Sequence, residues 1–334
     1  MGEPEKSAGF RRLRRRLLGA VGVAVVLGPA LAEEKPGPPS HPKGPKVFLD
    51  YDQVELDAAY DQDAYALNRR QLLDRYASTS DLVRARLGPP QRVAYGPSEI
   101  EKLDIYRAAG AKAPIMVFIH GGAWRTGLAK TYAFPAELFV AAGAHFVVPD
   151  FAAVGDVGGS LMVMAEQVRR AIAWVQANAA SFGGDGERLH LCGHSSGAHL
   201  AGAALITDWQ KDFGVPDDLV KTALLVSGMY DLKGPRLSAR SSYVAFDDAS
   251  EAALSTERHL DKLRTPLTVA YAGLDTPEFQ RQSRDFAAAV KQAGKPVALI
   301  RGDHYNHFEL IETLANPHGL LGRAALAQMG LAKG

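Results

Sequence analysis

The segment Gly193-His194-Ser195-Ser196-Gly197 sets a serine between two glycines, a spacing that suits nucleophilic catalysis. A buried strand is expected before it at Leu189–Cys192, and a helix after it at Ala198–Ile206. The two glycines permit the sharp strand-to-helix turn that exposes a serine hydroxyl. The backbone N–H of Ser196, at the start of the helix, can then donate to an oxyanion. We therefore predict that Ser195 is a nucleophile.

A second glycine-rich segment, His120-Gly121-Gly122-Ala123-Trp124, follows directly on an expected strand at Pro114–Ile119. Glycine amides carry no side chain that would obstruct a reacting group, and such loops hold the tetrahedral oxyanion in acyl transfer. The alternative is a simple tight turn with a packing tryptophan. We expect Gly121 and Gly122 to form an oxyanion hole together with Ser196.

A serine hydroxyl needs a histidine to accept its proton and an acid to orient that histidine. In a sheet with this kind of turn the chain order is serine, acid, histidine. Asp275 follows the expected strand Leu267–Ala272, so it is the predicted acid. Two other acids compete with it, Asp231 after the strand Thr222–Ser227 and Asp303 after the last strand; we interpret Asp231 as a structural turn residue.

The histidine should follow the last expected strand, Val297–Arg301, where His304 and His307 are both candidates. We favour His307, because it abuts the helical pattern Phe308–Leu314 and leaves a longer loop to reach back over the sheet. The predicted triad is therefore Ser195, Asp275 and His307.

Pocket shape is harder to predict. Trp124 and Tyr230 lie next to the predicted catalytic loops, where each either contacts the substrate or packs in the core. The segment Lys233–Asp261, between two expected strands, is a candidate for a small cap. Its many Ser, Ala and Asp residues argue against an apolar lipase lid.

The elements that would position these residues form an alternating pattern. Buried-strand runs alternate with helical patterns such as Leu161–Ala180, which indicates a parallel sheet covered on both faces. Two short strands, Arg92–Tyr95 and Lys102–Arg107, are expected as an antiparallel edge, with helices before them. We predict one α/β domain over residues 47–334, with a mostly parallel central sheet of about eight strands. Its reactive loops should lie at the carboxyl ends of the strands.

Composition narrows the classes of function. The 334 residues are 47% hydrophobic and 22% charged, with a formal net charge of +1, as in ordinary globular proteins. The excess positive charge comes from the basic residues of the first 16 positions. The rest of the chain therefore has no excess of basic residues, and no basic face suggests a nucleic-acid partner. The histidines lack metal-ligand spacing, Cys192 is the single cysteine, and no glycine-rich phosphate loop is present. We expect a small-molecule substrate, no cofactor and no metal.

The N-terminus has the layout of an export signal. Five arginines between Arg11 and Arg16 precede the apolar run Leu17–Leu27, and the small residues Ala30-Leu31-Ala32 follow. The alternative, a membrane anchor, is disfavoured because the apolar run is shorter than the ~20 residues that span a bilayer. We predict a signal over 1–32 that resembles the twin-arginine type, a flexible leader over 33–46, and a periplasmic or secreted enzyme.

Four segments, in matching order, resemble the arylformamidase (kynurenine formamidase) branch of the α/β-hydrolases, near the small carboxylesterases. They are Leu103-Asp104-Ile105-Tyr106, the His120–Trp124 and Gly193–Leu200 motifs, and Asp275-Thr276-Pro277-Glu278-Phe279 with Gln282-Ser283. The likeness spans about residues 50–316, and it implies the same triad and oxyanion hole. It also implies the α/β-hydrolase fold and the hydrolysis of carboxylic esters or activated small amides through an acyl-enzyme.

Two alternatives to general ester hydrolysis stay open. One is an arylformamidase that acts on N-formylated aryl amines, as in the family that the chain resembles. The other is a non-catalytic binding protein on a hydrolase fold, which the complete set of Ser195, Asp275 and His307 argues against.

Overall fold

The computed structural model describes residue 2 and residues 41–332. Residues 1–35 and 36–334 are separate units, and the described helices and strands all belong to the second. The expected export signal, and the leader up to residue 40, lie outside the described residues apart from residue 2. Within the described part of the chain, every helix is too short or too polar to span a bilayer.

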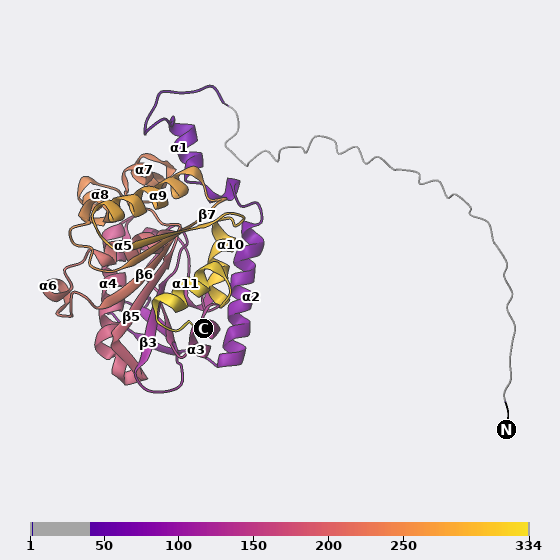
Figure 1. The fold of residues 1–334 in the computed structure, drawn as a ribbon. Coiled ribbons are helices and arrows are strands. Elements are labelled where there is room, and N and C mark those ends of the chain that lie inside the picture. The colour runs from indigo at the N-terminus through magenta and orange to yellow at the C-terminus, as the bar shows by residue number, and fades with distance from the viewer. Residues whose placement is uncertain (1, 3–40, 333–334) are drawn as a thin grey trace. The chain divides into compact units, whose positions relative to one another are not determined.

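A single eight-stranded sheet forms the centre of the described domain, as the sequence predicts (Figure 1). Its strand order is β1-β2-β4-β3-β5-β6-β7-β8. The first two strands pair antiparallel, and β2 also runs antiparallel to β4, whereas all the other neighbours are parallel. The strands are β1 Gln91–Ala94, β2 Lys102–Tyr106, β3 Ala113–Ile119, β4 His145–Pro149, β5 Gly184–His194, β6 Val220–Val226, β7 Leu267–Ala272 and β8 Val297–Gly302.

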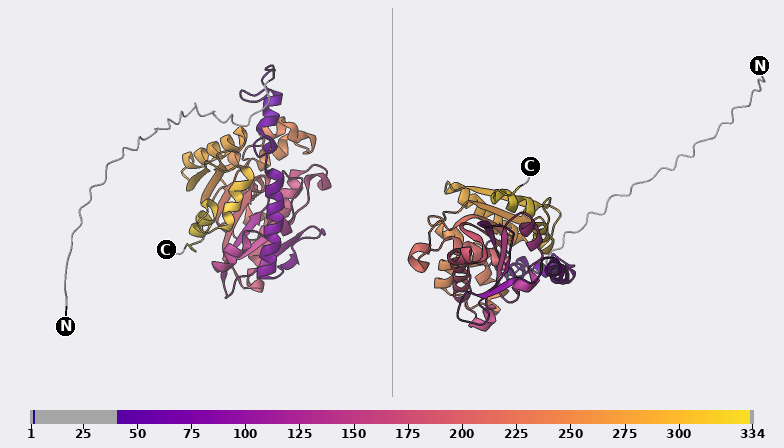
Figure 2. Two further views of the ribbon diagram at one scale, coloured as in Figure 1. Left: turned by 90° about the vertical axis from the view of Figure 1, so that its right-hand side faces the viewer. Right: turned by 90° about the horizontal axis from the view of Figure 1, so that it is seen from below.

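Helices cover both faces of this sheet, and Figure 2 shows the arrangement from two further sides. Successive side chains of a strand point to opposite faces. In β3, accordingly, Ile115 and Val117 belong to one apolar cluster and Met116 and Phe118 to another. The first cluster includes residues of α4, α5, α8 and α9, and the second includes residues of α2, α3, α10 and α11. These helices are α2 Arg69–Leu87, α3 Ala136–Ala141, α4 Leu161–Asn178, α5 Ser196–Leu205, α8 Asp248–Leu254, α9 Pro277–Gln292, α10 His307–Glu312 and α11 Leu320–Gln328.

The carboxyl ends of the parallel strands meet at one edge of the sheet, where ligands bind in open α/β folds. The loops after β3, β5, β6, β7 and β8 all open there. A segment that precedes the first strand in the sequence also reaches this edge. Its residue Gln62, in a short 3-10 helix after α1 (Gln53–Ala59), contacts Asp275.

The segment 233–261, expected as a possible small cap, connects β6 to β7. It consists of α7 (Lys233–Leu237), α8 and two 3-10 turns, Ala239–Ser242 and Thr256–His259. The remaining helix, α6 (Trp209–Phe213), lies between α5 and β6 in the chain.

Candidate active site

Ser195 lies in a strained turn between the end of β5 and the first residue of α5. Its φ of 57° and ψ of −126° are rare for a residue with a side chain. Its N–H donates to the Val226 carbonyl at 2.8 Å, which ties the turn to the neighbouring strand. A Cβ at Gly197 would lie 2.2 Å from the Ile119 carbonyl oxygen, so this position requires glycine. Strain of this kind is typical of functional sites.

The structure brings Asp275 and His307 together. Asp275 follows β7 and His307 begins α10, and the Nδ1 atom of His307 lies 2.6 Å from Oδ1 of Asp275. Both side chains are buried. The capping box of α10 orients the histidine, because the Asn306 side chain accepts the N–H groups of Phe308 and Glu309, each at 3.0 Å.

Three further donors hold the Asp275 carboxylate. Oδ2 accepts the Ala272 N–H at 2.8 Å and the Ser227 hydroxyl at 2.7 Å, while Oδ1 accepts from Gln62 Nε2 at 3.1 Å. Ser227 and Gln62 were not predicted as supporting residues from the sequence. Hydrogen bonds of this kind stabilise the charged form of a carboxylate and fix its orientation.

The competing candidates lie elsewhere. Asp231 forms an ion pair with Arg258 at 2.7 Å, as a structural turn residue would, and Asp303 pairs with Arg301 at 2.9 Å. The His304 side chain is exposed. None of these three residues lines the cavity that contains Ser195 and His307.

The loop after β3 lies against the serine turn. A Cβ at Gly121 would lie 3.1 Å from the Cβ of Ser195, and the Trp124 N–H donates to the Ser196 hydroxyl at 3.1 Å. Gly122 has a φ of 123°, and a Cβ there would lie 1.9 Å from the Thr126 carbonyl oxygen. Ser196 is the first residue of α5, where helix amides have no acceptor within the helix. The predicted oxyanion-hole residues are therefore neighbours of Ser195.

Trp124 and Tyr230, considered as substrate contacts, are instead core residues. The Trp124 indole N–H donates to His199 Nδ1 at 3.2 Å, and the Tyr230 ring stacks on Phe286 at 4.1 Å between centroids. Both side chains are almost completely buried, and neither lines the cavity. The packing alternative accounts for both, because large aromatic surfaces beside the catalytic loops stabilise those loops from behind.

His194, directly before the serine, packs against the candidate base. Its Nε2–H donates to the His307 carbonyl at 3.0 Å, and the two rings are 4.7 Å apart. Burial holds the pKa of His194 well below its ordinary value, and the nearby His307 lowers it further. A neutral His194 thus supports the position of His307 without adding a charge beside it.

A cavity of about 560 Å³ opens over Ser195 and His307. Its walls come from the loop after β3, from the segment that precedes α2, from α2 and from the segment 233–261. The possible cap therefore contributes to the wall of the site. The volume of the cavity suits a small-molecule substrate.

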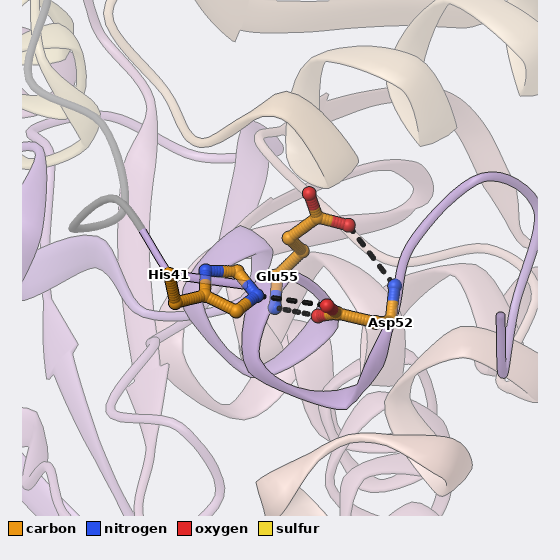
Figure 3. Close-up of side chains that lie close together, drawn as sticks. All are labelled: His41, Asp52 and Glu55. Carbon is orange, nitrogen blue, oxygen red and sulfur yellow. Dashed lines mark hydrogen bonds and ion pairs between the residues drawn. The ribbon is translucent and has the colours of Figure 1, made fainter. Parts of the chain in front are cut away.

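One group among the described residues has the composition of a metal site: His41, Asp52 and Glu55, whose ligand atoms lie within 4.8 Å of one another (Figure 3). Asp52 and Glu55 form the capping box of α1, each accepting the other's N–H at 3.0 Å. The remaining Asp52 oxygen accepts the Gly44 N–H at 2.7 Å and lies 2.8 Å from His41 Nε2, while Lys43 pairs with Glu55. These contacts hold the chain before α1 in place, and they engage both oxygens of Asp52 and Oε2 of Glu55.

Comparisons with known proteins show which family the chain belongs to. The profile of the family described as BD-FAE matches residues 103–228. Kynurenine formamidase from Danio rerio is 35% identical over 249 residues, which cover 71% of this chain and 81% of that protein. Esterase LipQ from Mycobacterium tuberculosis is 31% identical and covers 62% of this chain and 55% of its own.

Solved structures show the same fold at lower identity. A candidate thioesterase from Silicibacter sp. TM1040 matches with a TM-score of 0.69 and 23% identity, covering 80% of this chain and 97% of its own. An esterase from Pyrobaculum calidifontis matches with a TM-score of 0.60 and 19% identity, covering 81% and 96%. The chain therefore belongs to the α/β-hydrolase family, in the branch of the kynurenine formamidases and esterases, and it is a serine hydrolase.

Proposed function

We propose that this enzyme hydrolyses carboxylic esters and activated small amides through an acyl-enzyme on Ser195. One observation carries the proposal: the strained Ser195 turn and His307 border one cavity, and Nδ1 of His307 lies 2.6 Å from Oδ1 of Asp275. A serine hydroxyl becomes a nucleophile when a histidine held by a carboxylate takes its proton. The relatives named as esterases support the ester class.

In this mechanism Ser195 attacks the substrate carbonyl while His307 accepts the hydroxyl proton. Asp275 keeps the proton of His307 on Nδ1, so that Nε2 is free to receive the new one. The oxyanion is held by the N–H groups of Gly121, Gly122 and Ser196. His307 then protonates the leaving alcohol or amine, and a water molecule releases the acyl group by the same route. Removing a single oxyanion donor costs about 3–4 kcal/mol of transition-state stabilisation in comparable sites.

A fluorophosphonate probe, which labels activated serines, tests this proposal. Wild-type enzyme should be labelled and Ser195→Ala should not, while both proteins unfold at a similar temperature. Equal labelling of the two proteins, or no labelling of the wild type, would refute the mechanism. The second outcome would favour the non-catalytic binding protein instead.

A second candidate substrate class is the aryl formamides. The observation that favours it is the relative named kynurenine formamidase, 35% identical over 249 residues. A panel of p-nitrophenyl esters of increasing acyl length, tested beside an N-formylated aryl amine, separates the two classes. A higher kcat/KM for the formamide than for every ester would reverse the proposed order of preference.

We also propose that the enzyme is exported to the periplasm or secreted. The support is the arginine cluster, the apolar run Leu17–Leu27 and the small residues Ala30-Leu31-Ala32. N-terminal sequencing of the protein from the periplasm or medium of the source cell should begin at Glu33. A cytosolic chain that still begins at Met1 would refute export.

A further inference from the structure

Arg240 is a buried arginine in the wall of the active-site cavity. It belongs to the 3-10 turn Ala239–Ser242 of the segment between β6 and β7, and only 8% of its surface is exposed. It borders the same cavity as Ser195 and His307. Buried arginines are ordinarily paired with a carboxylate, because an unpaired charge is costly to remove from water.

The hydrogen-bond partners of Arg240 are neutral groups. One guanidinium NH2 group donates to the Tyr243 hydroxyl at 2.8 Å and the other to the Tyr60 carbonyl at 3.0 Å. The Nε atom is buried without a partner among the described residues. A guanidinium carries five N–H donors, so this side chain retains unused donors as well as its full charge.

Aromatic rings surround the guanidinium. Its central carbon lies 5.4 Å from the Trp124 ring, 5.7 Å from Tyr60 and 5.8 Å from Phe279. Ring faces attract a cation but do not neutralise it. Phe279 also contacts the His307 ring at 5.1 Å, so this cationic position is one ring away from the candidate base.

The carboxylates of the same cavity form their hydrogen bonds with groups other than Arg240. Asp63 binds Arg69 through both oxygens at 2.7 Å. Asp57 accepts the Ala239 N–H at 2.6 Å, and Asp61 caps a 3-10 helix by accepting the Asp63 N–H at 3.0 Å. No carboxylate among the described residues forms an ion pair with Arg240, so this guanidinium has no direct counter-ion.

We propose that Arg240 binds a carboxylate on the substrate, so that the enzyme prefers esters or amides that carry a negative charge near the scissile bond. This inference rests on the proposed function, since it names the substrate class of that same site. The planar guanidinium suits a carboxylate because it donates two parallel N–H bonds. The segment between β6 and β7 then sets specificity, while the loops after β3, β5, β7 and β8 supply the chemistry.

Matched pairs of coloured substrates test the proposal and locate the charge. The acyl-side pair is mono-p-nitrophenyl glutarate and p-nitrophenyl pentanoate. The leaving-group pair is the butyrate ester of 5-hydroxy-2-nitrobenzoate and p-nitrophenyl butyrate. We expect the wild type to give a higher kcat/KM for the anionic member of at least one pair. Hydrolysis of both neutral esters without any anionic preference would overturn this inference and leave the proposed function standing, whereas no hydrolysis and no fluorophosphonate labelling would overturn the proposed function itself.

Arg240→Gln should lower the anionic-to-neutral ratio of kcat/KM by a factor of about ten to one hundred, the usual effect of losing a hydrogen bond to a charged group. Arg264→Gln removes the same charge from an exposed position outside the cavity, and it should leave the ratio unchanged. An unchanged ratio in Arg240→Gln would overturn the proposal. If that variant does not fold, inhibition of the wild type decides: glutarate should compete with a neutral ester better than uncharged glutaramide, and equal inhibition would overturn the proposal.

Discussion

Replacing Asp275 by asparagine should lower turnover by orders of magnitude while the fold survives, and the contacts of this carboxylate explain why. Oδ2 accepts the Ala272 backbone N–H at 2.8 Å, a donor that cannot become an acceptor. The asparagine oxygen must therefore take that place, and its NH2 group faces Nδ1 of His307. The imidazole then has to accept at Nδ1 and carry its proton on Nε2, so it cannot receive the proton of Ser195. Gln62 can accommodate the change by flipping its amide, since its Oε1 is buried without a partner among the described residues.

The expected loss of kcat is large. Imposing the wrong histidine tautomer on the triad of a serine protease lowers kcat about 10⁴-fold. We expect a loss of about 10³- to 10⁴-fold here, or roughly 4–5.5 kcal/mol of transition-state stabilisation. Hydrolysis of p-nitrophenyl butyrate at about pH 8 measures the loss, and the thermal unfolding midpoint monitors the fold.

Asp231→Asn is the matched control, because it makes the same chemical change in the competing acid. Asp231 pairs with Arg258 on a partly exposed surface, where an ion pair contributes about 0–1 kcal/mol to stability. The kcat of Asp231→Asn should stay within about tenfold of the wild-type value. The assignment of Asp275 as the catalytic acid fails if folded Asp275→Asn keeps more than about a tenth of the wild-type kcat, or if Asp231→Asn is equally impaired.

Other variants and conditions test the surroundings of the site. Gly122→Ala should lower kcat at least about 100-fold, because the new Cβ would collide with the Thr126 carbonyl. Gly110→Ala is the control, since this glycine also has a positive φ (96°) but open space around it, and the variant should keep the wild-type kcat. Equal losses in the two variants would contradict the explanation by collision. Burial raises the pKa of the Cys192 thiol, so a disulfide reagent should react only after unfolding in guanidinium, and rapid reaction of native protein would contradict this burial. Burial also lowers the pKa of His199 to about 3, so the unfolded chain binds the extra proton between about pH 6.5 and 3. The stability that His199 contributes is therefore complete above about pH 6.5 and is lost as the pH falls, by about 1.4 kcal/mol per pH unit. Burial also lowers the pKa of other histidines, His190 and His194 among them, so urea unfolding from about pH 7 to 4.5 should show a shallower loss of stability for His199→Gln than for the wild type, and equal slopes would contradict the assignment.

Much of the sheet was predictable because central strands such as β3, β4 and β7 are continuous, fully buried and mostly apolar runs. The runs expected at Leu267–Ala272 and Val297–Arg301 agree with β7 and β8 to within one residue. By contrast, β5 begins at Gly184, five positions before the expected start at Leu189. Most of its first residues are polar and partly exposed, so they leave no apolar run in the sequence, although Gly184 still pairs with Ala113 of β3.

The central catalytic candidates were predictable for a related reason. Ser195 follows directly on a strand, Asp275 lies three positions after one and His307 begins a helix, and the order of the elements along the chain brings them to one edge. Gln62 was not predictable, because it reaches Asp275 from 213 positions away and lies in a short turn without a motif. Ser227 follows directly on β6, but its contact with Asp275 depends on a left-handed backbone (φ of 49°) that sequence patterns do not reveal.

Arg240 shows why substrate preference is the least predictable part of such a site. The catalytic groups need fixed positions relative to one another, so they occur at strand ends, where sequence patterns are strong. A specificity residue needs only to reach the cavity, and Arg240 does so from a short turn between β6 and β7 that has no distinctive sequence pattern. Arg240 stands out because no described residue places a carboxylate in an ion pair with it, and that depends on which side chains fold next to it. Relatives that share the triad can therefore differ in substrate through this one segment, which is why the paired anionic and neutral esters discriminate better than a panel graded by acyl length alone.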